Sequence, residues 1–316
     1  MKPRTTVLVT GATGNQGGAV ARTLVKQGMK VRALTRKPDS PAATKLEKLG
    51  VEVAAGSFDE EDALKTAMRE VDAVFLMGTP YEAGTEAEIR HGKKAVEVAR
   101  ALHLRHVVYS SVANADLRTG IPHFDSKFEI EKYLQASDVP YTVLAPVFFM
   151  ENALSPLMLP ALKETRYALP LPAPRQLQQV ALSDLAEVAA VVIQERHPFL
   201  GLRVDVASDE LTGDEAARVL SRVTGRTIRY EAVSLDQARA SSEDLAKMFE
   251  WFDRTGYSVD IAALRRRFPN VRWHTFETWA REQDWHAVNR RHPEGPDPSG
   301  AYVRTPRRVR GLPHFL

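Results

Sequence analysis

The segment TGATGNQGG, residues 10–18, constrains the fold of this chain more than any other. It follows a short apolar run and places Gly11, Gly14 and Gly17 at three-residue spacing. Between a strand and a helix, such glycines permit a tight turn, let backbone N–H groups approach a pyrophosphate, and let the helix pack close to the strand. A helix that begins near Gly17 would offer its N-terminal N–H groups to the phosphates. The sequence therefore predicts a dinucleotide-binding turn.

Short β-branched segments alternate with helix-like segments through the first half of the chain. Most of the strand-like segments are continuous apolar runs, as in strands that are buried on both faces of a sheet. One helix-like segment, residues 87–102, has a narrow face formed by Ile89, Gly92, Val96 and Ala99. The alternation predicts an α/β fold with a Rossmann-type, doubly wound parallel sheet. The predicted strands cover residues 5–10, 30–36, 51–57, 73–78, 106–111, 141–147 and 203–208.

The alternation ends after about Asn152. Residues 155–176 hold five of the 19 prolines, which favours loops and short helices. Pairs at capping-box spacing, Asp184 with Glu187 and Thr212 with Glu215, predict two later helix starts. We predict three units. The first is a nucleotide-binding domain at 1–152, and strands from 178–208 can rejoin its sheet. The second is a smaller substrate or partner lobe at 153–285, and the third is a basic tail at 286–316 that is rich in Pro, Gly and Arg.

Composition excludes several classes of function. The 316 residues include no cysteine, which excludes disulfides, thiolate metal sites and cysteine nucleophiles, so we predict no metal site and a cytoplasmic location. No signal peptide is recognisable and no apolar run approaches the roughly 18 residues of a membrane span, so no membrane association is expected. The net charge of +3 is uneven, because residues 286–316 carry six arginines against two acidic residues. Nucleic acid is not an expected partner, and the tail is interpreted as a solvated basic arm.

The end of the second predicted strand favours one cofactor. An NAD site usually places Asp or Glu there, about 20 residues beyond the glycines, to hold the ribose 2′-hydroxyl. This sequence has Arg36 and Lys37 instead, and its first acidic residue, Asp39, lies beyond Pro38. A guanidinium matches a 2′-phosphate in charge and in bidentate geometry. We therefore predict NADP(H) rather than NAD(H) as the cofactor; the alternative is an ordinary charged loop.

Taken with later segments, these residues resemble the NmrA-like family of atypical short-chain dehydrogenases. The matching segments are TGATGNQGG, VRALTRKP, GSFDEEDAL, HVVYSSV, HFDSKFEIEKYL and APVFFMENAL, in that order. The later segment DLAKMFEWFDRTGYSVD is similar to the NADPH-sensing, HSCARG-like branch of the family. The resemblance covers roughly residues 5–285 and leaves only the tail outside it.

The resemblance implies a Rossmann-type domain, a smaller and mostly helical C-terminal lobe, and a cleft between them. It also implies positions that contact the dinucleotide, in agreement with the rule that ligands bind beyond the carboxyl ends of parallel strands. The implied contacts are Gly11, Thr13, Gly14, Asn15 and Gln16, with Gly17 in the same turn, at the phosphates; Arg36, with Lys37 beside it, at the 2′-phosphate; Phe58 and Asp59 at the adenine; Thr79 on the ribose side; Lys127 at the nicotinamide ribose; and Phe148, Phe149, Glu151 and Asn152 at the nicotinamide end.

The candidate catalytic residues lie on the helix that follows the fifth predicted strand. Working short-chain dehydrogenases carry Tyr-x-x-x-Lys on one face of this helix, and the tyrosine donates a proton as hydride arrives. Here Lys127 is present, but His123 occupies the position four residues earlier, and Ser110 lies at the end of the preceding strand. Tyr133 lies near the opposite side of the helix and is a poor substitute.

Three interpretations follow from the missing tyrosine. In the first, His123 donates the proton, Lys127 holds the ribose and Ser110 holds the substrate oxygen. In the second, hydride transfer to a quinone comes first and water supplies the proton. In the third, the protein reduces nothing and reports NADP(H) through a change of shape or partner. Plainer roles also exist, with His123 as an ordinary helix-start residue and Lys127 paired with Glu131 on the surface.

The sequence does not decide whether the chain is an enzyme. The missing tyrosine weighs against ordinary ketone chemistry, and the resemblance covers both regulators and reductases. The favoured function is therefore an NADP(H)-binding redox sensor or regulator, and the alternative is an NADPH-dependent quinone or carbonyl reductase. The expected partners are NADP(H) and either a small quinone or carbonyl substrate or a regulatory protein, with a homodimer left open.

Overall fold

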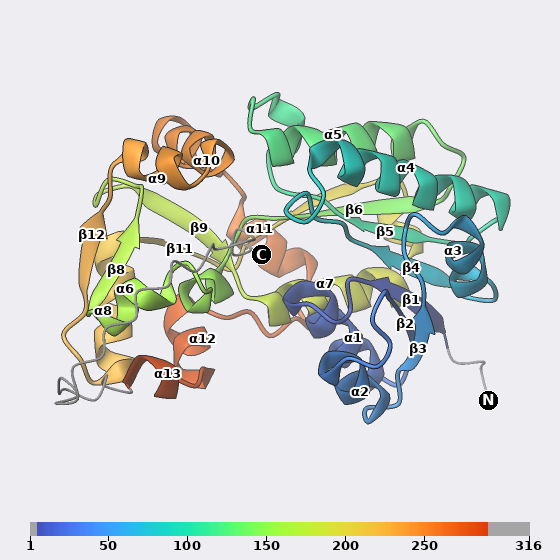
Figure 1. Cartoon of the computed structure of the whole chain (residues 1–316), viewed down its shortest axis with the longest axis horizontal. Coiled ribbons are helices and arrows are strands. Elements are labelled where there is room, and N and C mark those ends of the chain that lie inside the picture. Colours follow the sequence, from blue (N-terminus) through green and yellow to red (C-terminus); the bar gives the residue numbers. More distant parts are fainter. Residues whose placement is uncertain (1–4, 290–316) are drawn as a thin grey trace, which may run out of the picture.

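The computed structural model describes residues 5–289, and its central element is a seven-stranded sheet (Figure 1). The strand order is β10-β6-β5-β4-β1-β2-β3, and every neighbouring pair is parallel. The strands are β1 (Thr6–Thr10), β2 (Lys30–Thr35), β3 (Glu52–Ala55), β4 (Ala73–Leu76), β5 (Val107–Ser110), β6 (Tyr141–Pro146) and β10 (Arg203–Val206). The predicted doubly wound parallel sheet is confirmed.

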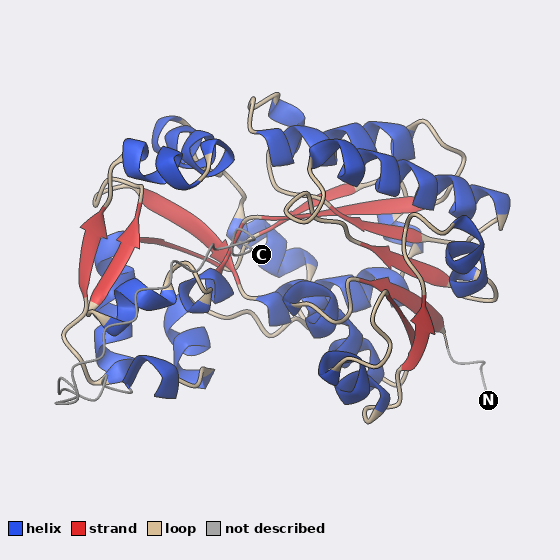
Figure 2. Ribbon diagram, in the orientation of Figure 1, coloured by secondary structure: helices blue, strands red, loops and turns tan. Residues whose placement is uncertain are grey.

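Helices cover both faces of this sheet (Figure 2). One layer contains α1 (Asn15–Lys26), α2 (Pro41–Glu47) and α7 (Leu182–Gln194), and the other contains α3 (Glu61–Met68), α4 (Thr85–Ala101) and α5 (Pro122–Gln135). α4 and α5 approach closely because Gly92 has no side chain: a Cβ there would lie 2.5 Å from Ile130 Cδ1. Glycine is therefore required at position 92, on the predicted helix face, for α4 and α5 to pack this closely.

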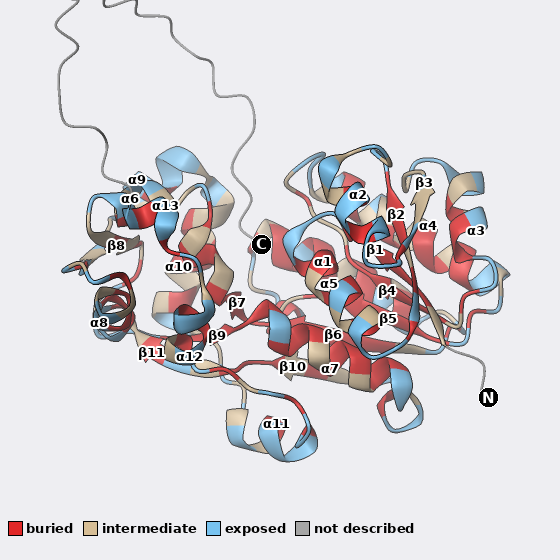
Figure 3. Ribbon diagram, turned by 90° about the horizontal axis from the view of Figure 1, so that it is seen from below, coloured by how far each residue is buried: buried red, intermediate tan, exposed pale blue. Residues whose placement is uncertain are grey.

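Each face of the sheet has its own apolar core. Val7 and Val9 of β1 belong to the core beneath α1 and α7, whereas Leu8 belongs to the core beneath α3, α4 and α5. All three side chains are fully buried, and the neighbouring strands β4 and β5 are likewise buried along their whole length (red in Figure 3). Because successive side chains of a strand point to opposite faces, burial on both sides produces the continuous apolar runs of the sequence.

Most of the remaining elements form a second, smaller and mostly helical lobe (Figure 1). It contains two small sheets, one with the order β11 (Asp209–Thr212), β9 (Gln176–Val180), β7 (Phe148–Phe149) and one that pairs β12 (Arg229–Ala232) with β8 (Arg166–Leu169). Its helices are α6 (Leu159–Lys163), α8 (Gly213–Thr224), α9 (Leu235–Ser241), α10 (Glu243–Arg254), α12 (Phe276–Glu282) and α13 (His286–Asn289). α11 (Ile261–Arg267) instead packs Leu264 into the core beneath α7.

One of the two predicted capping boxes is present. Thr212 caps α8 and exchanges both hydrogen bonds with Glu215, as predicted. The prediction for Asp184 was wrong, because α7 begins one turn earlier, after Ala181. The Asp184 carboxylate is instead fully buried and accepts a hydrogen bond of 2.6 Å from Ser208 Oγ.

The predicted division near residues 152 and 285 stays a prediction. α7 and β10 return to the large sheet after the chain has entered the second lobe, whereas β9 joins the small three-stranded sheet. Residues 286–289 of the predicted tail form α13, and the rest of that tail lies outside the described residues. Within residues 5–289, no helix combines the length and the apolar character that crossing a membrane requires.

Candidate functional site

The turn between β1 and α1 has a geometry that requires glycine at two positions. Gly11 has a φ of +63°, and a Cβ there would lie 2.0 Å from Met77 Sδ. At Gly17, a Cβ would lie 2.5 Å from the carbonyl carbon and oxygen of Gly11. Thr10 Oγ1 donates to the Met77 carbonyl and accepts from the Met77 N–H, both at 2.8 Å. The ends of β1 and β4 are thus held together where the strand order reverses, which is where ligands bind in doubly wound sheets.

The first turn of α1 is open to an anion. Gly14, the N-cap residue, provides no side-chain cap, and the first turn contains no acidic residue. Thr13, Gly14 and Asn15 are exposed. The first N–H groups of a helix have no intrahelical partner, and the helix dipole adds partial positive charge to them. The turn therefore fits phosphate groups.

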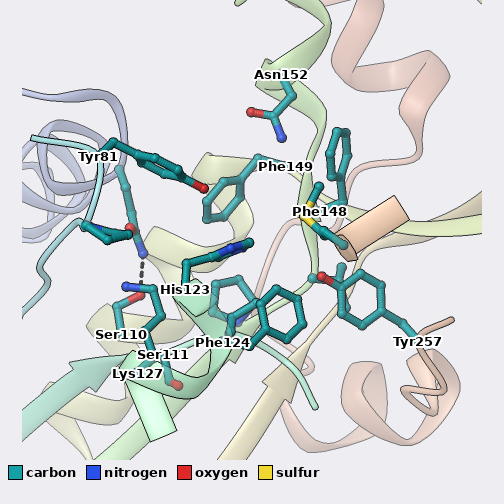
Figure 4. Close-up of a pocket in the computed structure, with 16 residues that line it drawn as sticks. Tyr81, Ser110, Ser111, His123, Phe124, Lys127, Phe148, Phe149, Asn152 and Tyr257 are labelled. Atoms are coloured by element: carbon teal, nitrogen blue, oxygen red, sulfur yellow. Dashed lines mark hydrogen bonds between the residues drawn. The ribbon is translucent and has the colours of Figure 1, made fainter. Parts of the chain in front are cut away.

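A pocket continues from this turn into the space between the two lobes (Figure 4). Its empty volume is about 610 Å³, counted together with its opening to solvent. Gln16 lies at its glycine-turn end, and the second lobe contributes Met248 and Tyr257. The lining is mostly apolar and aromatic, and it consists of Gln16, Pro80, Tyr81, Ser110, Ser111, Val112, His123, Phe124, Lys127, Pro146, Val147, Phe148, Phe149, Asn152, Met248 and Tyr257.

Lys127 is buried in this pocket and is paired with a carboxylate that sequence analysis missed. Its Nζ lies 2.7 Å from Glu88 Oε1 and donates to the Gly78 carbonyl at 3.2 Å. The side chains of Lys127 and Glu88 are 7% and 1% exposed. Glu88 lies four residues before Gly92 on the α4 face that meets α5, and this position is the signal that could have identified it. The alternative pairing of Lys127 with Glu131 does not occur, because Glu131 lies in a different ion-pair network.

His123 lines the pocket and contacts Asp244, a second residue that sequence analysis missed. Its Nδ1 lies 2.6 Å from Asp244 Oδ2, and its backbone N–H donates to Asp244 Oδ1 at 3.1 Å. The Tyr81 ring lies 6.0 Å from the imidazole, and the Phe124 ring packs edge-on at 4.8 Å. Asp244 belongs to the first turn of α10, 121 residues away in the sequence, so no local pattern could have revealed the contact.

Two serines at the end of β5 have different partners. Ser110 Oγ accepts a hydrogen bond from Gln16 Nε2, which ties the strand end to the first turn of α1. Ser111 donates to Glu131, whose carboxylate also accepts from Arg203. Burial raises the pKa of Glu131. Ser111 therefore supports the fold beneath the pocket, whereas Ser110 lies at the end of β5, beside the first turn of α1.

Arg36 and Lys37 follow β2 and are exposed. Arg36 Nη2 pairs with Glu82 Oε2 at 2.6 Å, and Glu82 lies in the loop between β4 and α4. The Arg36 side chain is 63% exposed, so its guanidinium remains accessible to an added anion. The Lys37 N–H donates to Thr35 Oγ1 at 3.2 Å.

The residues predicted at the adenine and ribose follow β3 and β4. Phe58 stacks on the imidazole of His91, with ring centroids 5.6 Å apart. Asp59 Oδ1 lies 2.8 Å from His91 Nε2, and this hydrogen bond lowers the pKa of Asp59. Thr79 Oγ1 accepts from the Tyr81 N–H at 3.3 Å.

The residues predicted at the nicotinamide end divide into two groups. β7 and Asn152 line the pocket, and Asn152 Oδ1 is a buried acceptor with no hydrogen-bond partner among the described residues. Glu151 is not part of the lining. Its carboxylate accepts from the Leu182 N–H at 3.0 Å and from Trp279 Nε1 at 3.1 Å, and burial raises its pKa to about 7. Glu151 therefore joins the start of α7 to α12.

Two tyrosines complete the pocket from opposite sides (Figure 4). Tyr81 comes from the loop between β4 and α4, and Tyr257 follows α10. Burial raises the pKa of both phenols well above the ordinary value, so both hydroxyls stay protonated at neutral pH. Each can donate a hydrogen bond to a ligand but is a weak acid.

Solved structures with the same fold include both enzymes and a regulator. An NADPH-dependent quinone oxidoreductase from Escherichia coli, solved with NADPH, has a TM-score of 0.74 at 24% identity and covers 87% of this chain and 98% of its own. NmrA, a negative transcriptional regulator solved with NADP, has a TM-score of 0.74 at 20% identity and covers 88% of this chain and 95% of its own. At these identities the likeness establishes the fold.

Sequence comparison identifies the family. A (4-alkanoyl-5-oxo-2,5-dihydrofuran-3-yl)methyl phosphate reductase from Streptomyces griseus is 32% identical over 236 residues, which cover 74% of this chain and 79% of the relative. The family model of the NmrA-like family matches residues 3–280, nearly all of the described chain. The HSCARG-like branch stays a prediction. On this evidence the chain belongs to the NmrA-like family.

Proposed function

We propose that the chain is an NADPH-dependent reductase of quinones or small conjugated carbonyl compounds. The observation that carries the proposal is the pocket, which runs from Gln16 beside the glycine turn to aromatic side chains of both lobes. A mostly apolar pocket with a few convergent polar groups is typical of a small-molecule site. The sequence alone favoured a sensor; the pocket, together with the relative named as a reductase, moves the preference to the enzyme.

The residues present fit NADP(H). Glycine at positions 11 and 17 allows the tight turn, because side chains there would clash with Met77 and with the Gly11 backbone. The uncapped start of α1 is suited to a pyrophosphate. Arg36 is exposed at the end of β2, where a 2′-phosphate needs a bidentate cation. At the far end, the unpartnered Asn152 Oδ1 is an acceptor for a carboxamide N–H. We propose that Lys127 hydrogen-bonds the nicotinamide ribose.

The chain's own residues provide orientation and a proton. NADPH, when bound, supplies a hydride. Phe148 and Phe149 provide apolar surface for a flat conjugated substrate and exclude water from it. We assign Ser110 to hold the substrate oxygen and His123 to donate the proton. A histidine side chain can act as a general acid near neutral pH, and we assign this role to His123 in place of the missing tyrosine.

Cofactor binding is tested by Gly14→Asp. Gly14 has an extended backbone (φ −93°, ψ −173°) that an N-cap Asp adopts. A Cβ there would lie 3.3 Å from the Gly11 carbonyl oxygen, so a small backbone shift offsets part of the gain from the new cap, and the melting temperature should change little. The added carboxylate competes with the phosphates, and NADPH affinity should fall by about tenfold or more. Fluorescence titration with NADPH measures the affinity, and Gly14→Asn separates occupation of the N–H groups from charge. Unchanged NADPH affinity in Gly14→Asp would place the cofactor elsewhere.

Turnover is tested by NADPH consumption across a panel of quinones, enones and aldehydes. At least one class of compound should be reduced. Substrates of different classes should inhibit one another competitively, because they share the pocket. Met248→Ala, which shortens one apolar wall that α10 contributes, should raise KM for the substrate and leave the NADPH affinity unchanged. Tight NADPH binding without turnover of any class would reject the reductase.

That last outcome would support a second function, an NADP(H) sensor. The observation in its favour is that the pocket has walls from both lobes, so a ligand that fills it can alter their contact. A regulatory protein partner, a homodimer and a cytoplasmic location stay predictions.

A further inference from the structure

The lining of the pocket carries few groups that can hold a positive charge. Among residues 5–289, it contains one lysine, Lys127, and one histidine, His123, and it contains no arginine and no carboxylate. Whether an anionic molecule can bind in the pocket therefore depends on the charges that lie directly behind these two side chains.

Lys127 presents no uncompensated positive charge to the pocket. Its Nζ lies 2.7 Å from Glu88 Oε1, and Ser126 Oγ donates to the other oxygen of this carboxylate at 2.6 Å. Lys127 Nζ also donates to the Gly78 carbonyl at 3.2 Å. The Glu88 side chain is 1% exposed, so water does not separate the two charges. They cancel for a molecule in the pocket, and one N–H of the ammonium remains for a neutral hydrogen-bond acceptor.

His123 lies beside a carboxylate in the same way. Asp244 Oδ2 is 2.6 Å from the imidazole Nδ1, and the two side chains are 10% and 23% exposed. With a neutral imidazole the two residues carry one negative charge, and with a protonated imidazole they carry none. Lys247, also on α10, acts on the carboxylate of Asp125 and is not part of the lining. In neither state of the imidazole does this wall offer net positive charge.

The start of α5 has no N–H group left for an anion. A helix N-terminus attracts anions through its free N–H groups and its dipole, and His123 lies in the first turn of α5. The His123 N–H donates to Asp244 Oδ1 at 3.1 Å. The next two N–H groups, of Phe124 and Asp125, donate to the Ile121 carbonyl, each at 3.0 Å. The carboxylates of Asp244 and Asp125 also oppose the helix dipole at this end.

Behind the serines of the lining, carboxyl groups outnumber cations. Ser111 donates to Glu131, which pairs with Arg203. Arg203 Nη2 also lies 3.2 Å from Asp205 Oδ1 and 3.5 Å from Asp116 Oδ1. One guanidinium thus faces three carboxyl groups, and this network offers no positive charge to a ligand either.

We infer that the pocket selects uncharged conjugated carbonyl compounds and excludes those that carry an anionic group beside the reacting carbonyl. This selectivity rests on the proposed reductase function, whose substrate class it narrows. An anion that enters the pocket loses water, and a desolvated charge is costly unless an opposite charge is free to pair with it. A carbonyl oxygen needs only a hydrogen-bond donor, which the neutral phenol of Tyr257 can provide.

Two substrates of similar shape and different charge test the selectivity. 1,4-Naphthoquinone-2-sulfonate has its charge next to a carbonyl, whereas the corresponding primary sulfonamide is neutral. The kcat/KM of each is measured at saturating NADPH and divided by its uncatalysed rate of reduction by NADPH, which cancels intrinsic reactivity. The parent protein should favour the sulfonamide by about tenfold or more. Because the chain has no cysteine, thiol addition to the quinone does not interfere. Equal corrected values for the two substrates overturn the inference.

Met248→Lys adds a cation without a counter-charge to the wall that α10 contributes. Lysine and methionine side chains are similar in length, and Met248→Gln is the matched neutral control. The preference for the sulfonamide should fall about tenfold in Met248→Lys and by less than about twofold in Met248→Gln. Both substrates are measured on the same protein, so a change in stability or in overall activity cancels in the ratio.

Asp244→Asn removes a compensating charge that the parent protein already has. The Asn oxygen can still accept from the His123 N–H, so the fold should persist. At about pH 5.5 an imidazole without a neighbouring carboxylate is ordinarily protonated, and the preference for the sulfonamide should then fall by about threefold to tenfold. Glu243→Gln is the control on the same helix turn, since Glu243 pairs with Arg239, and it should keep the parent ratio. Unchanged ratios in both Met248→Lys and Asp244→Asn overturn the inference.

Failure of the proposed function gives a different result from failure of the selectivity. If no compound of the panel is reduced, the reductase is rejected. Calorimetric binding of naphthalene-2-sulfonate and naphthalene-2-sulfonamide to the NADPH-saturated protein then tests the selectivity alone, because neither compound accepts a hydride. Binding of the sulfonamide at least about tenfold more tightly supports charge selection by the pocket, and any other result overturns it.

Discussion

At the scale of single residues, Lys127 and Glu88 form a deeply buried ion pair in the site. Glu88→Gln would leave the Lys127 ammonium enclosed without a counter-charge, and we expect a loss of about 3 kcal/mol in the free energy of unfolding. The double variant Glu88→Leu, Lys127→Met should cost less than the sum of its single variants, because it removes both charges. Urea denaturation measures each value. Glu129→Gln, which breaks the half-exposed pair with Lys132 on the same helix, should cost under about 1 kcal/mol. Equal losses in Glu88→Gln and Glu129→Gln would contradict this account.

At the scale of elements, the loop between β4 and α4 links the predicted phosphate site to the pocket. It carries Glu82, which pairs with Arg36, and next to it Tyr81, which lines the pocket. A 2′-phosphate that binds Arg36 must share the guanidinium with the Glu82 carboxylate or displace that carboxylate. Glu82→Gln should therefore raise NADPH affinity by about two- to fivefold, which corresponds to the strength of an exposed ion pair. NADH lacks the 2′-phosphate, and its affinity should not change. Titration of both cofactors, with the exposed Glu86→Gln as control, checks this; an equal gain for NADH would refute it.

The elements also differ in how far the sequence could predict them. The glycine turn, the strand runs and the cap at Thr212 were predictable, because each depends on contacts within a few residues. β8 was missed because it lies in a proline-rich stretch and its partner β12 begins about 60 residues later. Glu88 and Asp244 reach the site from α4 and α10, and only the tertiary arrangement brings them to Lys127 and His123.

At the scale of the whole molecule, a second histidine–aspartate pair joins α7, which covers one face of the large sheet, to the segment that leads into α12. His274 Nδ1 lies 2.5 Å from Asp184 Oδ1, and its backbone N–H donates to Asp184 Oδ2 at 2.8 Å. Both side chains are buried, and His274 Nε2 lies 3.3 Å from Glu282. The hydrogen bond to Asp184 raises the pKa of His274 above its ordinary value of 6.5.

This raised pKa makes stability depend on pH in a defined direction. The folded protein holds the His274 proton more tightly than the unfolded chain, so the contribution is complete below about pH 6.5 and is lost as pH rises through the folded pKa. At pH 6, His274→Gln should lower the free energy of unfolding by about 1.5–3 kcal/mol, the value of a hydrogen bond to a charged group. The difference between the two proteins should shrink toward pH 9. Urea denaturation at both pH values gives that difference, and taking it cancels the titration of Glu151, whose pKa is about 7. A difference that grew with pH would mean that His274 is neutral in the folded state and that Asp184 holds the lobes through its backbone contact instead.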